Sequence, residues 1–143
     1  MKCADVMKRD VHRVQESDTV QWAACCLRDA NIGFLPVCDD NGTVVGTLTD
    51  RDIAIRLAAS DRSAAGCTVG SIMTPEVVSC RASDDLAEAE HLMATRKKSR
   101  IVITDDHGRL QGGVSLSDVA ERDTLVRAAV TLRNVTEREV HLS

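Results

Sequence analysis

Residues 37–56, VCDDNGTVVGTLTDRDIAIR, decide the fold, because residues 103–122, ITDDHGRLQGGVSLSDVAER, repeat them without a gap. Asp39 therefore matches Asp105, at a constant spacing of 66 residues. The same spacing pairs Val6-Met7 with Ile72-Met73, Ser17-Asp18 with Ser83-Asp84, and Gly46 with Gly112. A repeat of this kind predicts a fold built from two copies of one supersecondary unit.

Each copy is predicted to begin with a short extended piece and a helix. The extended pieces cover residues 11–14 and 77–80. Apolar residues then recur at the spacing of one helix face, after Ser-Asp pairs at residues 17–18 and 83–84 that can serve as N-caps.

A β-hairpin and a second helix complete each copy. The predicted strands are residues 34–38 and 44–48 in the first copy and residues 100–103 and 110–114 in the second. The turns between them, Asp-Asp-Asn-Gly and Asp-Asp-His-Gly, supply residues that tolerate a positive φ. Thr49 or Ser115 then caps a helix whose first turn carries Asp52 or Asp118.

These elements predict an α+β fold of two tandem, pseudo-symmetric β-α-β-β-α repeats. The expected boundaries are residues 1–58 for the first repeat, 59–68 for a linker, 69–125 for the second repeat, and 126–143 for a C-terminal helix end and polar tail.

Composition narrows the class of protein. A hydrophobic content of 43% can bury a core, and a net charge of -4 argues against nucleic acid or an anionic membrane surface as a partner. No apolar run approaches the roughly 20 residues that span a bilayer, so a soluble, cytoplasmic protein is expected. The six cysteines contain no Cys-x-x-Cys spacing, which favours reduced core thiols over a zinc site or a disulfide framework.

The repeated motifs resemble the cystathionine-β-synthase (CBS) domain family. The resemblance rests on Gly33-x-Leu35-Pro36-Val37, Asp39-x-x-Gly42 and Val45-Gly46-x-Leu48-Thr49-Asp50-Arg51-Asp52 in the first copy, and on Ile72-Met73-Thr74-Pro75 and Gly112-Gly113-Val114-Ser115-Leu116-Ser117-Asp118 in the second. It implies a stand-alone tandem CBS pair, also called a Bateman module. Such modules often bind AMP, ADP, ATP or S-adenosylmethionine and commonly form homodimers.

The resemblance also implies two composite ligand clefts, each joining the Ser/Thr-x-x-Asp of one repeat to backbone of the other. In such a cleft the carboxylate accepts hydrogen bonds from the ribose hydroxyls, and free backbone N–H groups favour phosphate. The first cleft is expected to contain Thr49, Asp52, Thr74, Val77, Ser79 and Lys98. The second is expected to contain Ser115, Asp118, Arg100, Lys8, Val11, Arg13, Ile32 and Gly33.

Two of these assignments have structural alternatives. Ser/Thr-x-x-Asp is also a capping box, in which both side chains satisfy helix-end N–H groups. The basic cluster at residues 96–100 lies where a helix is expected to end, and cations are favourable there through the helix dipole. Arg100 has Phe34 as its counterpart in the first copy, so the cleft that contains Arg100 is expected to suit a phosphorylated ligand better.

The sequence therefore predicts an adenine-nucleotide or S-adenosylmethionine sensor that signals to a separate, unidentified effector protein. No nucleophile, base or metal set is arranged as an enzyme requires, and no cofactor is needed. The alternative is a ligand-free homodimeric module on which another protein docks. Trp22 on the first helix is expected at the edge of an interface, which allows such a contact.

Overall fold

The computed structural model describes residues 1–122 and 125–142. Their contacts divide the chain into two compact units. Unit 1 combines Met1–Val11 with the chain from Val78 onward, and unit 2 is the continuous stretch His12–Val77. Each unit therefore contains the sheet of one repeat together with the segment that begins the other repeat.

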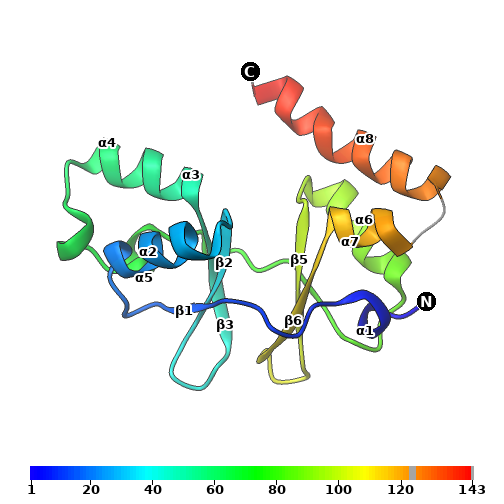
Figure 1. The fold of residues 1–143 in the computed structure, drawn as a ribbon, viewed down its shortest axis with the longest axis horizontal. Helices are drawn as coiled ribbons and strands as arrows, with labels where there is room; N and C mark the ends of the chain where they lie inside the picture. Colours follow the sequence, from blue (N-terminus) through cyan, green and yellow to red (C-terminus); the bar gives the residue numbers. More distant parts are fainter. Residues whose placement is uncertain (123–124, 143) are drawn as a thin grey trace. The chain divides into compact units, whose positions relative to one another are not determined.

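Unit 2 is built on a three-stranded sheet in the order β1-β2-β3 (Figure 1). β1 is parallel to β2, and β2 is antiparallel to β3. The strands are β1 (Val14–Gln15), β2 (Phe34–Cys38) and β3 (Val44–Thr49). The helices are α2 (Val20–Ala30), α3 (Asp50–Asp52), the π-helix η1 (Ile53–Leu57), α4 (Ala58–Ser60), the 3-10 helix η2 (Ala64–Gly66) and α5 (Val69–Ile72).

Unit 1 repeats this plan with a sheet in the order β4-β5-β6, again one parallel and one antiparallel pair. The strands are β4 (Ser79–Cys80), β5 (Arg100–Thr104) and β6 (Leu110–Ser115). The helices are α1 (Cys3–Val6), α6 (Leu86–Arg96), α7 (Leu116–Arg122) and α8 (Leu125–Leu142). The predicted α+β class and its tandem β-α-β-β-α order are confirmed.

The spacing of 66 residues is preserved in three dimensions. The hairpin strands β2 and β3 end 66 residues before β5 and β6, and both hairpins shift register at the matched positions Val37/Cys38 and Ile103/Thr104. The turn glycines Gly42 and Gly108 have φ values of 80° and 79°. The repeated sequence therefore encodes a repeated backbone, including its irregularities.

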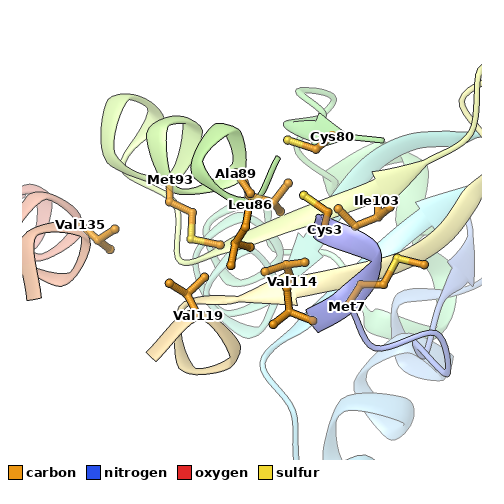
Figure 2. Packing of buried hydrophobic residues seen from close by; sticks show 12 residues of the cluster. Cys3, Met7, Cys80, Leu86, Ala89, Met93, Ile103, Val114, Val119 and Val135 are labelled. Atoms are coloured by element: carbon orange, nitrogen blue, oxygen red, sulfur yellow. The ribbon is translucent and has the colours of Figure 1, made fainter. Parts of the chain in front are cut away.

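Each unit has its own core of aliphatic and sulfur side chains. In unit 2, Val20, Ala23 and Leu27 of α2 pack against Leu35 and Leu48 of the hairpin. Figure 2 shows the corresponding cluster of unit 1, where Leu86, Ala89 and Met93 of α6 meet Val114 and Val119. Burial of such side chains is the main term that stabilises folds of this size.

The predicted N-caps of the long helices were wrong by one or two positions. Thr19 caps α2, with its hydroxyl accepting the Trp22 N–H at 3.1 Å. Asp85 caps α6, with its carboxylate accepting the Ala87 N–H at 3.0 Å. The matched aspartate Asp18 instead accepts the Gln15 N–H at 2.8 Å, so it closes the turn that precedes the helix.

The chain after α7 differs from the expected helix end and polar tail. Residues 125–142 form one helix, α8, whose Val135 and Thr131 side chains are buried. Lys97, which ends α6 with a left-handed φ of 57°, donates a hydrogen bond to the Asn134 carbonyl at 3.0 Å. Its ammonium also lies 3.6 Å from a carboxylate oxygen of Glu137. The helix α8 is thus packed onto unit 1.

The segment that begins each repeat, here called the exchanged segment, pairs with the sheet of the other repeat: residues 1–11 pair with β6, and residues 69–77 pair with β3. Matched glycines allow this close approach. Lys8 and Gly113 exchange two backbone hydrogen bonds, as do Thr74 and Thr47. A Cβ atom on Gly112 would lie 2.5 Å from the Lys8 carbonyl oxygen, and one on Gly46 would lie 2.7 Å from the Thr74 carbonyl oxygen. Glycine within a strand therefore marks a close backbone approach here.

Candidate functional site

In unit 1 the candidate site forms where β6 meets α7. The Ser115 hydroxyl accepts the Asp118 N–H at 3.2 Å, and the carboxylate oxygen Oδ2 of Asp118 accepts the Ser115 N–H at 2.9 Å. This is the reciprocal capping box, which satisfies two N–H groups at the helix start. Asp118 is only 6% exposed, so the box fixes the direction of its carboxylate.

The second oxygen of this carboxylate faces the exchanged segment. Oδ1 of Asp118 lies 3.4 Å from the ammonium nitrogen of Lys8. Lys8 is brought there by its backbone bonds to Gly113 on β6. Because the Lys8 side chain is 75% exposed, solvent screens this ion pair and the ammonium can leave the carboxylate at little cost.

Two further predicted residues border Ser115 and Asp118. Arg100 begins β5 and stands directly opposite Ser115 in the antiparallel register. Val11 lies beside β6, because its Cγ2 is 3.7 Å from the position of a Cβ on Gly113. Unit 1 therefore brings together Lys8, Val11, Arg100, Ser115 and Asp118, five of the eight residues predicted for the second cleft.

Unit 2 contains the matching half of the first predicted cleft. The Thr49 hydroxyl accepts the Asp52 N–H at 3.1 Å, and Oδ2 of Asp52 accepts the Thr49 N–H at 3.0 Å. Here Oδ1 of Asp52, at the end of α3, lies 3.7 Å from the guanidinium of Arg56 on the adjoining π-helix η1. Thr74 occupies the place of Lys8, on the edge of β3, and Val77 is half-buried.

The other predicted residues belong to the opposite unit from their expected partners. Ser79 on β4 and Lys98 after α6 lie in unit 1. Arg13, Ile32 and Gly33 lie in unit 2. Gly33 sits beside the Asp50 carboxylate. Burial raises the pKa of the Cys38 thiol, and the nearby positive charge of Arg13 opposes that rise.

Sequence reasoning missed Arg56, the cation that accompanies Asp52, whereas Lys8 was predicted for the same cleft as Asp118. Arg56 both approaches Asp52 and donates to the Ile72 carbonyl at 2.8 Å, which ties the helix after β3 to α5. The spacing of four residues between Asp52 and Arg56 could have indicated this pair. No local spacing could have indicated the pair of Lys8 and Asp118.

In each carboxylate one oxygen is bonded within the capping box, and the other can exchange its partner. Oδ2 accepts the backbone N–H of Ser115 or Thr49, and Oδ1 of Asp118 or Asp52 faces a cation near the surface. A pair of adjacent hydroxyls could replace that cation as donors to Oδ1. The arrangement can therefore serve as a cap and as an acceptor for a polyol at the same time.

In the described part of the chain, no three side chains of His, Cys, Asp or Glu come together in a way that could hold a metal ion. None of its helices combines the length and apolar character needed to cross a membrane.

Comparison with known families now decides the classification. The model of the CBS domain matches residues 3–59 and, a second time, residues 69–125. The chain belongs to the CBS-domain family. Its two matches make it a tandem CBS pair, as the motifs predicted.

Relatives share the whole pair. The CBS domain-containing protein YhcV of Bacillus subtilis is 35% identical over 139 residues, which cover 96% of either chain. An inosine-5'-monophosphate dehydrogenase of Methanocaldococcus jannaschii is 33% identical over 128 residues, but these cover 90% of this chain and only 25% of that enzyme. CBS pairs thus occur both alone and within enzymes.

Solved structures of CBS pairs share this fold. Hypoxic Response Protein I, solved with two coordinated zinc ions, superposes with a TM-score of 0.79 and 30% identity over 87% of this chain and 100% of that one. The CBS pair of MJ0100, solved with 5'-methylthioadenosine and S-adenosyl-L-methionine, gives a TM-score of 0.74 and 25% identity over 85% of this chain and 98% of that one.

Proposed function

We propose that this CBS pair is a regulatory sensor of an adenosine ligand: AMP, ADP, ATP or S-adenosylmethionine. The observation that carries the proposal is the pair of matched carboxylates, Asp52 and Asp118, each held by a capping box with Oδ1 directed at a displaceable cation. The ribose hydroxyls of the ligand would donate to that oxygen. The adenosyl ligands bound by the similar MJ0100 pair support this choice of chemistry.

The two halves should differ in ligand preference. Unit 1 places two cations, Lys8 and Arg100, around Ser115 and Asp118. In unit 2 the matched positions are Thr74 and Phe34, which add no charge. We therefore assign phosphorylated ligands to the site with Asp118, where Lys8 moves from the carboxylate to phosphate. Arg13, Ile32 and Gly33 are proposed to complete that site, and Ser79 and Lys98 to complete the site with Asp52.

Binding would act by a population shift rather than by catalysis. A ligand that favours one arrangement of the pair changes what a partner recognises. We propose that the protein is not an enzyme, that it acts in the cytoplasm as a homodimer, and that it signals to a separate effector protein rather than to nucleic acid.

The test is thermal melting with AMP, ADP, ATP and S-adenosylmethionine, with GTP as the control ligand. At tenfold excess over Kd, a ligand adds about 1.4 kcal/mol of stability, which raises Tm by about 3–6 °C. We expect a shift for at least one adenosine compound and none for GTP. AMP, ADP or ATP should give a larger shift than S-adenosylmethionine at the site with Asp118.

The matched variants are Asp118→Asn and Asp52→Asn. Asparagine keeps an oxygen that accepts the N–H of Ser115 or Thr49, so the helix cap survives while the anionic acceptor is lost. Loss of the nucleotide-induced shift in Asp118→Asn, with the shift kept in Asp52→Asn, would place the phosphorylated ligand in unit 1. An unchanged shift in both variants would contradict the assignment to these carboxylates.

A ligand-free docking module is the second candidate. Trp22 and Ile55 of unit 2 are 57% and 52% exposed, and large exposed apolar side chains are typical of protein interfaces. No shift with any compound at millimolar concentration, together with a stable dimer in sedimentation, would favour this function over the sensor.

A further inference from the structure

Arg56 joins the helix after β3 to the exchanged segment of unit 2. Its Nη1 donates a hydrogen bond to the Ile72 carbonyl at 2.8 Å, while its Nη2 lies 3.7 Å from Oδ1 of Asp52. One guanidinium therefore lies between the candidate ligand carboxylate and the backbone of residues 69–77. The planar fork of arginine can reach two acceptors at once, whereas a lysine at this position would offer a single nitrogen.

The carbonyl that accepts from Arg56 stands at the end of a helix. Ile72 is the last residue of α5, and the carbonyl groups at a helix end have no partner within that helix. The Ile72 side chain is 3% exposed and belongs to the core of unit 2, so packing sets the position of this carbonyl. Arg56 thus bonds to an acceptor with a fixed direction, although its own side chain is 44% exposed.

The segment beyond Ile72 carries a residue of the predicted site. Thr74 follows two positions later and exchanges two backbone hydrogen bonds of 2.9 Å with Thr47 on β3. Thr47 in turn lies two residues before Thr49, where the capping box begins. A bond at Ile72 therefore fixes the part of the segment that borders the site.

The turn that carries Arg56 also departs from the regular α-helix. Residues 53–57 form the π-helix η1, whereas residues 119–122, their counterparts in unit 1, continue the α-helix α7. Turns of the π type are rare within helices and occur frequently at functional sites. This observation is independent of the hydrogen bond to Ile72 and points to the same residue.

We propose that Arg56 is a positioning residue of the candidate site in unit 2: it fixes residues 69–77, and with them Thr74, beside Asp52 before a ligand arrives. When ribose hydroxyls take Oδ1 of Asp52, the bond to Ile72 remains, so the segment stays in place. Such preordering strengthens binding, because the ligand does not have to order the segment itself. The effect on binding rests on the proposed function, whereas the effect on the segment does not.

The first experiment compares amide hydrogen exchange, resolved by NMR, in the ligand-free parent and in Arg56→Gln. The amides of Thr74 and Thr47 should exchange about five- to tenfold faster in the variant, because a charged hydrogen bond to the segment is lost from a partly exposed position. The amides of Lys8 and Gly113 form the matched pairing in unit 1 and should keep the parent rate, which shows that the variant is folded.

Two further variants separate position from charge. Arg51→Gln removes the same charge from an exposed arginine of α3 and should leave all four exchange rates unchanged. Arg56→Lys keeps the charge but loses the fork, so its rates at Thr74 and Thr47 should fall between those of the parent and Arg56→Gln. Parent rates at these two amides in Arg56→Gln would overturn the proposal, and so would an equal rise in Arg51→Gln.

A second measurement tests the link to ligand binding. In proteins that carry Asp118→Asn, the Tm shifts caused by AMP and S-adenosylmethionine report on the site with Asp52, and their concentration dependence gives Kd. Adding Arg56→Gln should raise the Kd of the compound that binds there about three- to tenfold. An unchanged Kd beside faster exchange would overturn the positioning role. If neither compound shifts Tm in Asp118→Asn, the proposed function of this site fails, and the exchange rates alone decide whether Arg56 fixes the segment.

Discussion

The two units share one backbone plan but hold their exchanged segments by different chemistry. In unit 1 the segment 1–11 brings the Cys3 side chain into the core and an ammonium to Asp118. In unit 2 the matched stretch around α5 brings Val69 to the core and Thr74 to β3, while Asp52 pairs with Arg56 of its own repeat. The two units therefore place their segments alike, although the side chains that the segments contribute differ.

The difference links the segment directly to the candidate site in unit 1 alone. Its segment contacts the candidate ligand carboxylate directly, through Lys8. In unit 2 the carboxylate Asp52 and its cation Arg56 both belong to the helix after β3, so the segment is not part of that ion pair. A conformational change in the segment should thus alter the surroundings of Asp118 more than those of Asp52.

The largest expected effect comes from blocking the close approach that both units share. In Gly112→Ala the new Cβ would lie 2.5 Å from the Lys8 carbonyl oxygen, so the backbone pairing of Lys8 with Gly113 must give way. We expect a loss of about 2–4 kcal/mol in the free energy of unfolding, measured by urea denaturation.

Gly113→Ala is the matched control on the same strand. Its Cβ would find its nearest atoms at 3.7 Å, which is ordinary contact, so the variant should stay close to the parent in stability. Equal stability of Gly112→Ala and Gly113→Ala would show that segment 1–11 does not need its place on β6.

An effect of intermediate size on stability is expected when either carboxylate, Asp118 or Asp52, is replaced. Asp118→Ala removes a cap and leaves Lys8 without its partner, so we expect a loss of about 1–2 kcal/mol in the free energy of unfolding. Asp52→Ala removes a similar cap but no direct contact to the segment around α5, because the bond to the Ile72 carbonyl is made by Arg56.

Hydrogen exchange distinguishes the two cases. The amides of Lys8 and Gly113, which bond to each other across the pairing, should exchange faster in Asp118→Ala. The matched amides of Thr74 and Thr47 should keep the parent rate in Asp52→Ala. Unchanged exchange at Lys8 in Asp118→Ala would mean that the ion pair does not hold the segment.

The smallest effect concerns the left-handed residues that end the long helices. Asn31 and Lys97 have φ values of 54° and 57°, a conformation that glycine adopts without strain. Asn31→Gly should change the free energy of unfolding by less than about 1 kcal/mol. Lys97→Gly should be less favourable than Asn31→Gly, because it loses the bonds to Asn134 and Glu137 on α8. Calorimetric Tm values of the two variants test the order, and an equal gain in both would show that Lys97 does not hold α8.

Local sequence signals predicted the elements well and their caps less well. The hairpins follow from apolar runs joined by turns that contain Gly42 and Gly108, whose positive φ the turn requires. The N-cap of α2 was misplaced because Asp18 and Thr19 can both cap, and only the turn with Gln15 engages Asp18 elsewhere. Where two adjacent polar residues can both cap a helix, other contacts decide which one does, and residue spacing does not reveal those contacts.

The candidate site was predictable where its parts are close in sequence. Thr49-x-x-Asp52 and Ser115-x-x-Asp118 form the capping boxes that their spacing predicts. The ammonium of Lys8 reaches Asp118 from far along the chain, so no spacing rule identifies this contact, although the family resemblance placed both residues in one cleft. The use of Lys8 in ligand binding stays a prediction.

The exchange of segments also sets an order of events during synthesis. Unit 2 is continuous from His12 to Val77, so all of its residues are available once that stretch has left the ribosome. The segment Met1–Val11 is made earlier, yet its sheet partners on β4 and β6 are made last. Because domains fold as their residues emerge, unit 2 should form first. Residues 1–11, which carry Cys3 and Lys8, should therefore stay unpaired until β4 and β6 have been made and unit 1 can fold.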